Sequence, residues 1–294
     1  MNRSVALPFL AAAVCLLAAA IATPVAARPA DPSPGDTGVV EIVYTHDGSR
    51  LVGRVVCEDS AAVTLATEYG RVIIPREAIA SRRRPDPVPD GAGRYRLPDP
   101  NRTRLFFAPT ARMLPQGTGY FQNIYLFFNG VAVGLTDHIT IGGGMSFFPS
   151  DDFFDNNIFY LTPKVGTTVD ENLDIAAGLL WIEVPGDDPD GLGIAYGVAT
   201  VGSERASLTG GLGWGFADGR VTDSPLVMLG GMVRVSNRIA LVTENWKIPE
   251  VDEVGFSWGL RFIGESLSAD LGFVNATGSD IFPGIPYVDF VVNF

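Results

Sequence analysis

The last ten residues, 285–294, read IPYVDFVVNF, and they decide the fold. Apolar side chains occupy every second position, from Val288 through Phe290 and Val292 to Phe294. A period of two predicts a β-strand. Chain ends are usually polar and poorly ordered, so an alternating strand that stops on an aromatic residue indicates a terminus built into a sheet.

The same alternation fills the second two thirds of the chain. It predicts twelve strands at residues 104–112, 119–135, 138–148, 157–169, 172–184, 191–202, 205–217, 224–236, 238–248, 252–263, 266–276 and 286–294. Short connections (TD, DEN, SER, NR, GES) alternate with mostly longer polar ones such as VPGDDPDG and NATGSDIFPGI. This arrangement is typical of transmembrane β-barrels, and an even strand count places both barrel ends on the short-turn, periplasmic side.

The expected fold class is therefore all-β: an antiparallel transmembrane barrel of about twelve strands, preceded by a small periplasmic β-barrel-like domain. One face of each strand is apolar and the other is small and glycine-rich, as in VGFSWGLRF at residues 254–262. Trp181, Trp214 and Trp258 fit an aromatic girdle at a membrane interface. The alternative is a soluble β-sandwich, which would bury its apolar face instead.

Residues 1–27 carry the features of a signal peptide: Arg3, the apolar run VALPFLAAAVCLLAAAIA and a small-residue cleavage region before Arg28. An uncleaved membrane anchor is the alternative. Cleavage would remove Cys15 and leave Cys57 alone, so we expect no internal disulfide. Export without a disulfide fits a Gram-negative envelope protein. A short spacer follows at residues 28–37.

Residues 38–81 predict a small β-domain of four strands, VVEIVYT, LVGRVVC, AVTLAT and RVIIP, joined by tight turns. The stretch DGSRLVGRVV…AVTLATEYGRVIIPREAI resembles an Sm-like or SH3-like small barrel. The resemblance implies RNA or peptide binding. Because an exported protein rarely meets RNA, an envelope protein or peptide is the expected partner. Residues 82–103, with five prolines and two glycines, form the linker to a barrel at 104–294.

Two further resemblances concern the barrel. The final strand, with Val288, Phe290, Val292 and Phe294, resembles the signal read by the bacterial barrel-assembly machinery. The stretch DPNRTRLFFAPTARMLPQGTGYFQNIYLFFNGVAVGLTDHITIGGG at residues 99–144 looks like the opening hairpins of a family of uncharacterised bacterial outer-membrane β-barrel proteins. Both imply residence in the bacterial outer membrane, in contact with its lipid and lipopolysaccharide, and neither implies an activity.

Strand phase points a set of charged side chains into the lumen. These lumen-lining candidates are Lys164, Asp174, Arg234, Glu244, Arg261, Asp270 and Asp289. Charges there either line water and set selectivity or pair across strands and brace the barrel, as Arg261 could with Asp270. The sequence leaves both readings open, and it also leaves open whether a segment fills the lumen.

The distribution of charge along the chain restricts the classes of partner that the protein can bind. The first 104 residues carry 13 basic against 11 acidic side chains, whereas the rest carries 8 against 22. The acidic barrel excludes nucleic acid, which needs the opposite sign. Acidic outer loops would attract cations. Asp187, Asp188 and Asp190 form a weak candidate for a metal site, and no cofactor is expected.

Function is the least determined property. The leading hypothesis is a narrow passive channel, porin-like, for small cationic or neutral solutes. The alternative is a closed structural or docking barrel whose periplasmic domain tethers another envelope component. A barrel lipase or protease is disfavoured, because the two histidines, His46 and His138, both fall in turns. We therefore expect no catalytic residues.

Overall fold

The computed structural model describes residues 40–67, 70–83, 88–89, 95–148, 157–183, 191–217 and 219–294. These fall into two compact units, with the boundary between Pro98 and Asp99. The signal peptide, the spacer and Asp187, Asp188 and Asp190 lie outside the described residues. No helix in the described part of the chain is long and apolar enough to cross a membrane.

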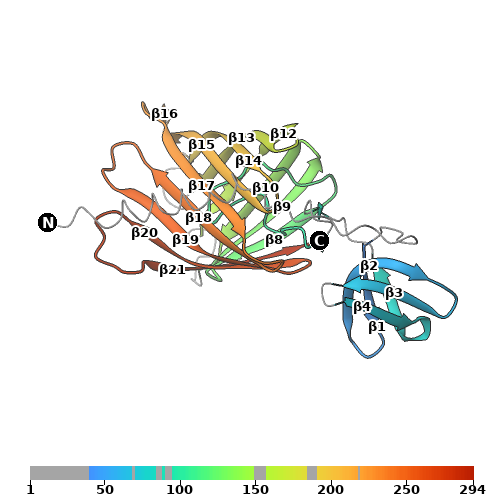
Figure 1. Ribbon diagram of the computed structural model, residues 1–294. Coiled ribbons are helices and arrows are strands. Elements are labelled where there is room, and N and C mark those ends of the chain that lie inside the picture. The colour runs from blue at the N-terminus through green and yellow to red at the C-terminus, as the bar shows by residue number, and fades with distance from the viewer. Residues whose placement is uncertain are drawn as a thin grey trace. The chain divides into compact units, whose positions relative to one another are not determined.

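The larger unit is a closed antiparallel β-barrel (Figure 1). Its strands are β8 (Gly119–Ile124), β9 (Phe128–Thr136), β10 (Ile139–Ser146), β11 (Phe159–Leu161), β12 (Lys164–Asp170), β13 (Leu173–Glu183), β14 (Leu192–Gly202), β15 (Ala206–Ala217), β16 (Arg220–Val221), β17 (Leu226–Arg234), β18 (Ile239–Lys247), β19 (Val254–Ile263), β20 (Leu267–Ala276) and β21 (Ile285–Asn293). β11 and β12 are two halves of one wall strand, because both pair with β10 and β13. β16 only extends β15, and β21 pairs with β8 to close the wall.

The expected all-β antiparallel barrel is confirmed, with twelve strands in the wall. Two of the twelve predicted strands are wrong, and the two errors cancel in the strand count. The predicted strand at 119–135 is two strands, since the chain reverses at Tyr125–Phe127 between β8 and β9. The predicted strand at 104–112 makes only an isolated bridge between Arg104 and Pro109 and lies outside the wall. The first residues of the stretch 99–144 therefore lie outside the wall, and its wall hairpins begin at β8 and β9.

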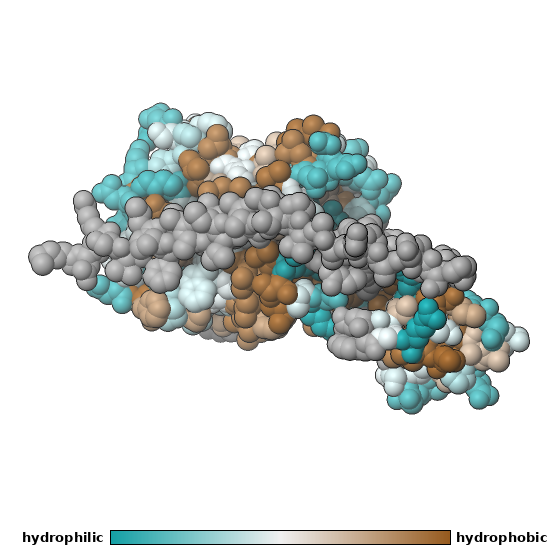
Figure 2. All heavy atoms as spheres, in the orientation of Figure 1, coloured by the Kyte–Doolittle hydropathy of each residue, from teal (hydrophilic) through white to brown (hydrophobic). Residues whose placement is uncertain are grey.

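Burial in the barrel is inverted relative to a soluble protein. Large apolar side chains such as Leu212, Trp258 and Phe290 are exposed on the outer face. Arg261 and Glu244, by contrast, are fully buried. Figure 2 shows hydrophobic side chains gathered over the visible barrel wall, with hydrophilic ones toward its ends. An apolar outer face on a sheet without free edges is what a lipid environment requires.

The smaller unit contains a five-stranded antiparallel sheet in the order β4-β3-β2-β1-β5. Its strands are β1 (Val40–Thr45), β2 (Arg50–Glu58), β3 (Ala62–Thr67), β4 (Gly70–Pro75) and β5 (Ile79–Arg83), with a 3-10 turn, η1 (Arg76–Ala78), before β5. Val43, Val63 and Leu65 form the centre of its core. The four predicted strands are present. The fifth falls partly in the stretch assigned to the linker, which also holds a two-residue pairing of β6 (Val88–Pro89) with β7 (Tyr95–Arg96).

Arg82 belongs to this domain's ion-pair network. It bonds to Glu41 at 2.6 Å and to Glu58 at 2.6 Å, and Arg76 adds a second contact to Glu58. The hydrogen bond from Arg82 and the charges of both arginines hold the pKa of Glu58 at about 2, below its ordinary 4.5. Arg82 is thus occupied within the domain.

Gly119→Ala should destabilise the seam that closes the barrel. A Cβ on Gly119 would lie 2.7 Å from the Phe294 ring and 2.9 Å from the Ala132 carbonyl oxygen. Such crowding costs about 1–3 kcal/mol. The measurement is the temperature at which the folded barrel loses its faster gel mobility in detergent. Gly197→Ala is the matched control, because nothing lies within 4 Å of its Cβ position. Equal stability of both variants would contradict this account of the seam.

Acid should weaken the small domain through Glu58. A carboxylate whose pKa is lowered by folding stabilises the fold above its unfolded value, and that stabilisation is lost as pH falls from 4.5 toward 2. Urea midpoints of a fragment spanning residues 31–98, followed by circular dichroism, should therefore fall over this window. Glu58→Gln should flatten the dependence, while Glu77→Gln should leave it. An unchanged pH profile in Glu58→Gln would overturn the assignment.

Candidate functional site

An inner segment, residues 99–114, occupies the barrel interior and fixes the geometry of the site. It starts beside Arg261 on β19, through Asp99, and returns to β10, where the amide of Leu114 donates to Thr140 Oγ1 at 3.3 Å. Both contacts lie toward the short-turn ends of their strands. The segment turns at residues 105–108, where the Leu105 amide donates to the Ala108 carbonyl at 2.8 Å. The turn is therefore its deepest point.

Glu244, on β18, holds this turn. The amides of Phe106, Phe107 and Ala108 all donate to Glu244 Oε2, each at 2.9 Å. The indole N–H of Trp246 donates to the other carboxylate oxygen at 2.6 Å. A fully buried carboxylate is costly unless it is hydrogen-bonded, and here four donors satisfy it.

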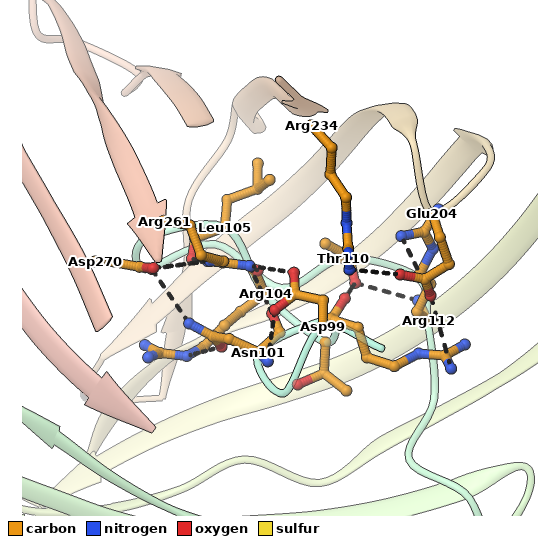
Figure 3. A network of polar contacts seen from close by, with 12 residues as sticks. Asp99, Asn101, Arg104, Leu105, Thr110, Arg112, Glu204, Arg234, Arg261 and Asp270 are labelled. Atoms are coloured by element: carbon orange, nitrogen blue, oxygen red, sulfur yellow. Dashed lines mark hydrogen bonds and ion pairs between the residues drawn. The ribbon is translucent and has the colours of Figure 1, made fainter. Parts of the chain in front are cut away.

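Arg261 binds the start of the segment. Its guanidinium makes a two-bonded pair with Asp270, at 2.8 Å for each bond, and reaches Asp99 at 3.0 Å. It also donates to the carbonyl oxygens of Asn101 at 2.8 Å and Leu105 at 2.6 Å. Figure 3 shows Asp270, Asp99 and Asn101 gathered around this one side chain. The pairing of Arg261 with Asp270 that the sequence suggested is present.

Two further basic side chains join the segment to the wall. Lys164 donates to the carbonyl oxygens of Thr103, Thr110 and Arg112, the last at 2.8 Å. Arg104, from the inner segment, pairs with Asp289. All of these groups are buried.

A looser cluster lies at the short-turn end. Glu204, in the turn between β14 and β15, has Arg102, Arg112 and Arg234 at 3.8, 3.9 and 3.6 Å. Arg112 also approaches Asp174, at 3.8 Å. These separations exceed hydrogen-bond length, so the cluster is held by charge more than by directed bonds.

The seven lumen candidates thus all contact the inner segment or one of its partners. Sequence reasoning missed the residues on the other side of these contacts: Asp99, Asn101, Arg104, Arg112 and Glu204. Three arginines within eleven residues, 102–112, were the available signal. The residues of the candidate assembly signal lie on the outer face, with Phe294 hydrogen-bonded to Gly119 in both directions.

The remaining chemical candidates lie elsewhere. His138 is in the β9–β10 turn, with Nδ1 3.1 Å from the Gly166 carbonyl oxygen. It borders a cavity of about 260 Å³ that Arg102 and Asp174 also line. The described residues contain no group of three or more His, Cys, Asp or Glu side chains placed to hold a metal. Cys57 is an exposed free thiol, although it stands in the apolar stretch LVGRVVC.

Comparison with known proteins adds the following findings. No family model matches the chain, and no curated protein matches it. Among solved structures, the KdgM porin is similar with a TM-score of 0.43 and 6% identity over 60% of this chain and 96% of its own. The NanC porin has a TM-score of 0.40 and 6% identity, over 60% and 97%. OmpT, an outer membrane protein of Vibrio cholerae, has a TM-score of 0.31 and 11% identity, over 86% and 93%. Likeness this distant carries no argument about activity, so the interior is interpreted from its own residues.

Glu244→Gln should loosen the inner segment. The amide cannot match a carboxylate that accepts three backbone bonds, and the loss of charge should cost about 2 kcal/mol, roughly thirtyfold in the equilibrium for release. Trypsin cleavage after Arg104 and Arg112, followed by mass spectrometry on the folded barrel, measures that release. Glu253→Gln, in an exposed loop, is the control. Equal protection in both variants would show that Glu244 does not retain the segment.

Proposed function

We propose that this protein is an outer-membrane channel for small cationic or neutral solutes, closed at rest by its own inner segment. One observation carries the proposal: the wall closes through β21 and β8 without the inner segment. Residues 99–114 supply no strand to that wall. The segment can therefore leave while the backbone pairing that lipid demands stays intact.

Charge supports the choice of solute. Five acidic wall residues contact the inner segment or its partners, against three basic ones: Asp174, Glu204, Glu244, Asp270 and Asp289 against Lys164, Arg234 and Arg261. The segment brings three arginines, 102, 104 and 112, and one acid, Asp99. Its positive excess of two balances the negative excess of the wall. An open lumen would keep the negative excess and favour cations.

The small domain has a place in this proposal. Short turns of such barrels face the periplasm, so a chain that enters the lumen from that side would come from a periplasmic domain. We propose an envelope protein or peptide as partner of residues 38–81, and pulling on that domain as one means of withdrawing the segment. The barrel-assembly machinery and the lipid and lipopolysaccharide of the membrane remain the other proposed partners.

A permanently closed docking barrel is the second candidate. The observation that favours it is the number of buried charge-assisted bonds on the segment, because breaking a buried pair costs about 3–5 kcal/mol when no water replaces the lost partner. In that case the segment would be a fixed anchor for the small domain. We propose no catalytic role for either unit.

Planar-bilayer recording separates the two candidates. The full mature chain should be silent, and a chain lacking residues 28–114 should conduct with a reversal potential that favours cations. Deletion to residue 103 alone should open the barrel less, because the turn held by Glu244 remains. A folded but silent truncated barrel would favour docking, and steady current through the full chain would refute closure by the segment.

A reversible lock provides the control. The Ala111 amide donates to Thr200 Oγ1 at 2.8 Å, so Ala111→Cys with Thr200→Cys, in a Cys57→Ala background, should form a disulfide between segment and wall. The full chain with Glu244→Gln should open at times, because its segment is loosened. Adding the cysteine pair to that variant should silence these openings under oxidation and restore them on reduction. Openings that persist under oxidation would place the conducting path elsewhere.

A further inference from the structure

The barrel interior is divided into two layers of different chemistry. The charged contacts described above lie between the turn of the inner segment and the short-turn ends of the strands. Beyond that level, the inward positions of β13, β14, β20 and β21 are largely apolar, and Ser146 on β10 is a polar exception. Leu180 and Ile194 are a cross-strand pair, and they lie on the same face of the sheet as the pair of Asp174 and Thr200. Val274 pairs with Ile285 in the same phase as the pair of Asp270 with Asp289.

The floor of this outer layer is aromatic. Phe107, at the turn of the inner segment, is 49% exposed, whereas its neighbour Phe106 is fully buried. The rings of Phe106 and Phe107 both pack edge-on against Tyr287, with centroids 5.0 and 4.9 Å apart. Trp246 stands two residues beyond Glu244 on β18, bonded to its carboxylate. Because Glu244 fixes the backbone beneath Phe107, the ring is presented in a set position.

The outer layer also carries little charge. Within the described strands, the inward positions beyond Glu244 and Tyr287 hold no Asp, Glu or Lys and one Arg, Arg220, which pairs with Ala217 at the rim. The Glu244 carboxylate itself is saturated by four donors. The rim residues Asp223, Asp252 and Glu253 are acidic and would repel anions. A surface of apolar and aromatic side chains with few polar groups suits a neutral organic molecule.

Two residues of this surface are exposed in the described part of the chain, since Ile285 is 59% exposed and Phe107 is half exposed. We propose that the outer half of the lumen binds a neutral, ring-bearing apolar small molecule that stacks on Phe107. As a statement about the transported solute, this rests on the channel proposed above and concerns its neutral solutes. Binding itself requires no opening of the inner segment.

Indole, a neutral bicyclic compound, is the probe. Saturation-transfer difference NMR on the full chain in lipid nanodiscs should show saturable indole binding that neither glucose nor choline displaces. Phe107→Ala should weaken it about tenfold, because an aromatic stacking partner is lost. Phe273→Ala is the matched control, since Phe273 packs on Trp258 at the lipid face, 5.3 Å between centroids. Should Phe107→Ala fail to fold, Ile285→Ser tests the same layer at its rim.

Indole binding that does not saturate, or that is equal in Phe107→Ala and wild type, would mean partition into lipid and overturn the proposal. Displacement by choline would also overturn it and return the site to cations. Bilayer recording distinguishes the two failures. If the full chain binds indole and the truncated barrel stays silent, the proposed channel is refuted and the proposed binding site stands. If the truncated barrel conducts and the full chain does not bind indole, only the proposed apolar site is refuted.

Discussion

The backbone amides of Phe106, Phe107 and Ala108 converge on one carboxylate oxygen of Glu244, and the interior depends on that contact. In lipid every strand amide of the wall is committed to a neighbouring strand. A segment inside a closed barrel finds no free ladder and must take its hydrogen bonds from wall side chains. Glu244, Thr140, Thr200 and Lys164 supply them. The wall sets the barrel shape, and polar inward side chains decide what fills it.

Much of the fold could be predicted because a period of two survives in almost every wall strand. The failures have physical causes. The turn between β8 and β9 uses Tyr125 and Leu126 at positive φ, 54° and 67°, where glycine or asparagine is expected. Edge-on packing of Tyr125 against Tyr287, at 5.6 Å, offsets part of that strain. No turn residue marked the reversal, so the two strands were predicted as one.

The weak alternation in RLFFAPTAR predicts a strand at residues 104–112, which belong to the inner segment. Pairing partners separate the two cases, and they are not local in sequence: Leu105 meets β17 and β19, while Ala111 meets Thr200. Phase alone pointed all seven charged wall residues inward. Their partners could not be derived in the same way, since Glu204 lies in a turn and Asp99 in a stretch predicted to be a linker. One feature of the sequence pointed to these partners: an excess of carboxylates in the wall strands beside an arginine-rich segment.

The two layers of the lumen constrain function in opposite directions. A buried network in which charges balance favours closure, because withdrawal of the segment must be compensated by water entering the charged layer. The apolar layer gains nothing from water, and it stands open above the turn that Glu244 holds. A molecule bound there would touch Phe107 and so contact the same turn that closes the barrel. Occupancy of the outer layer and release of the inner segment would then be coupled through one turn, with Glu244 as their common support.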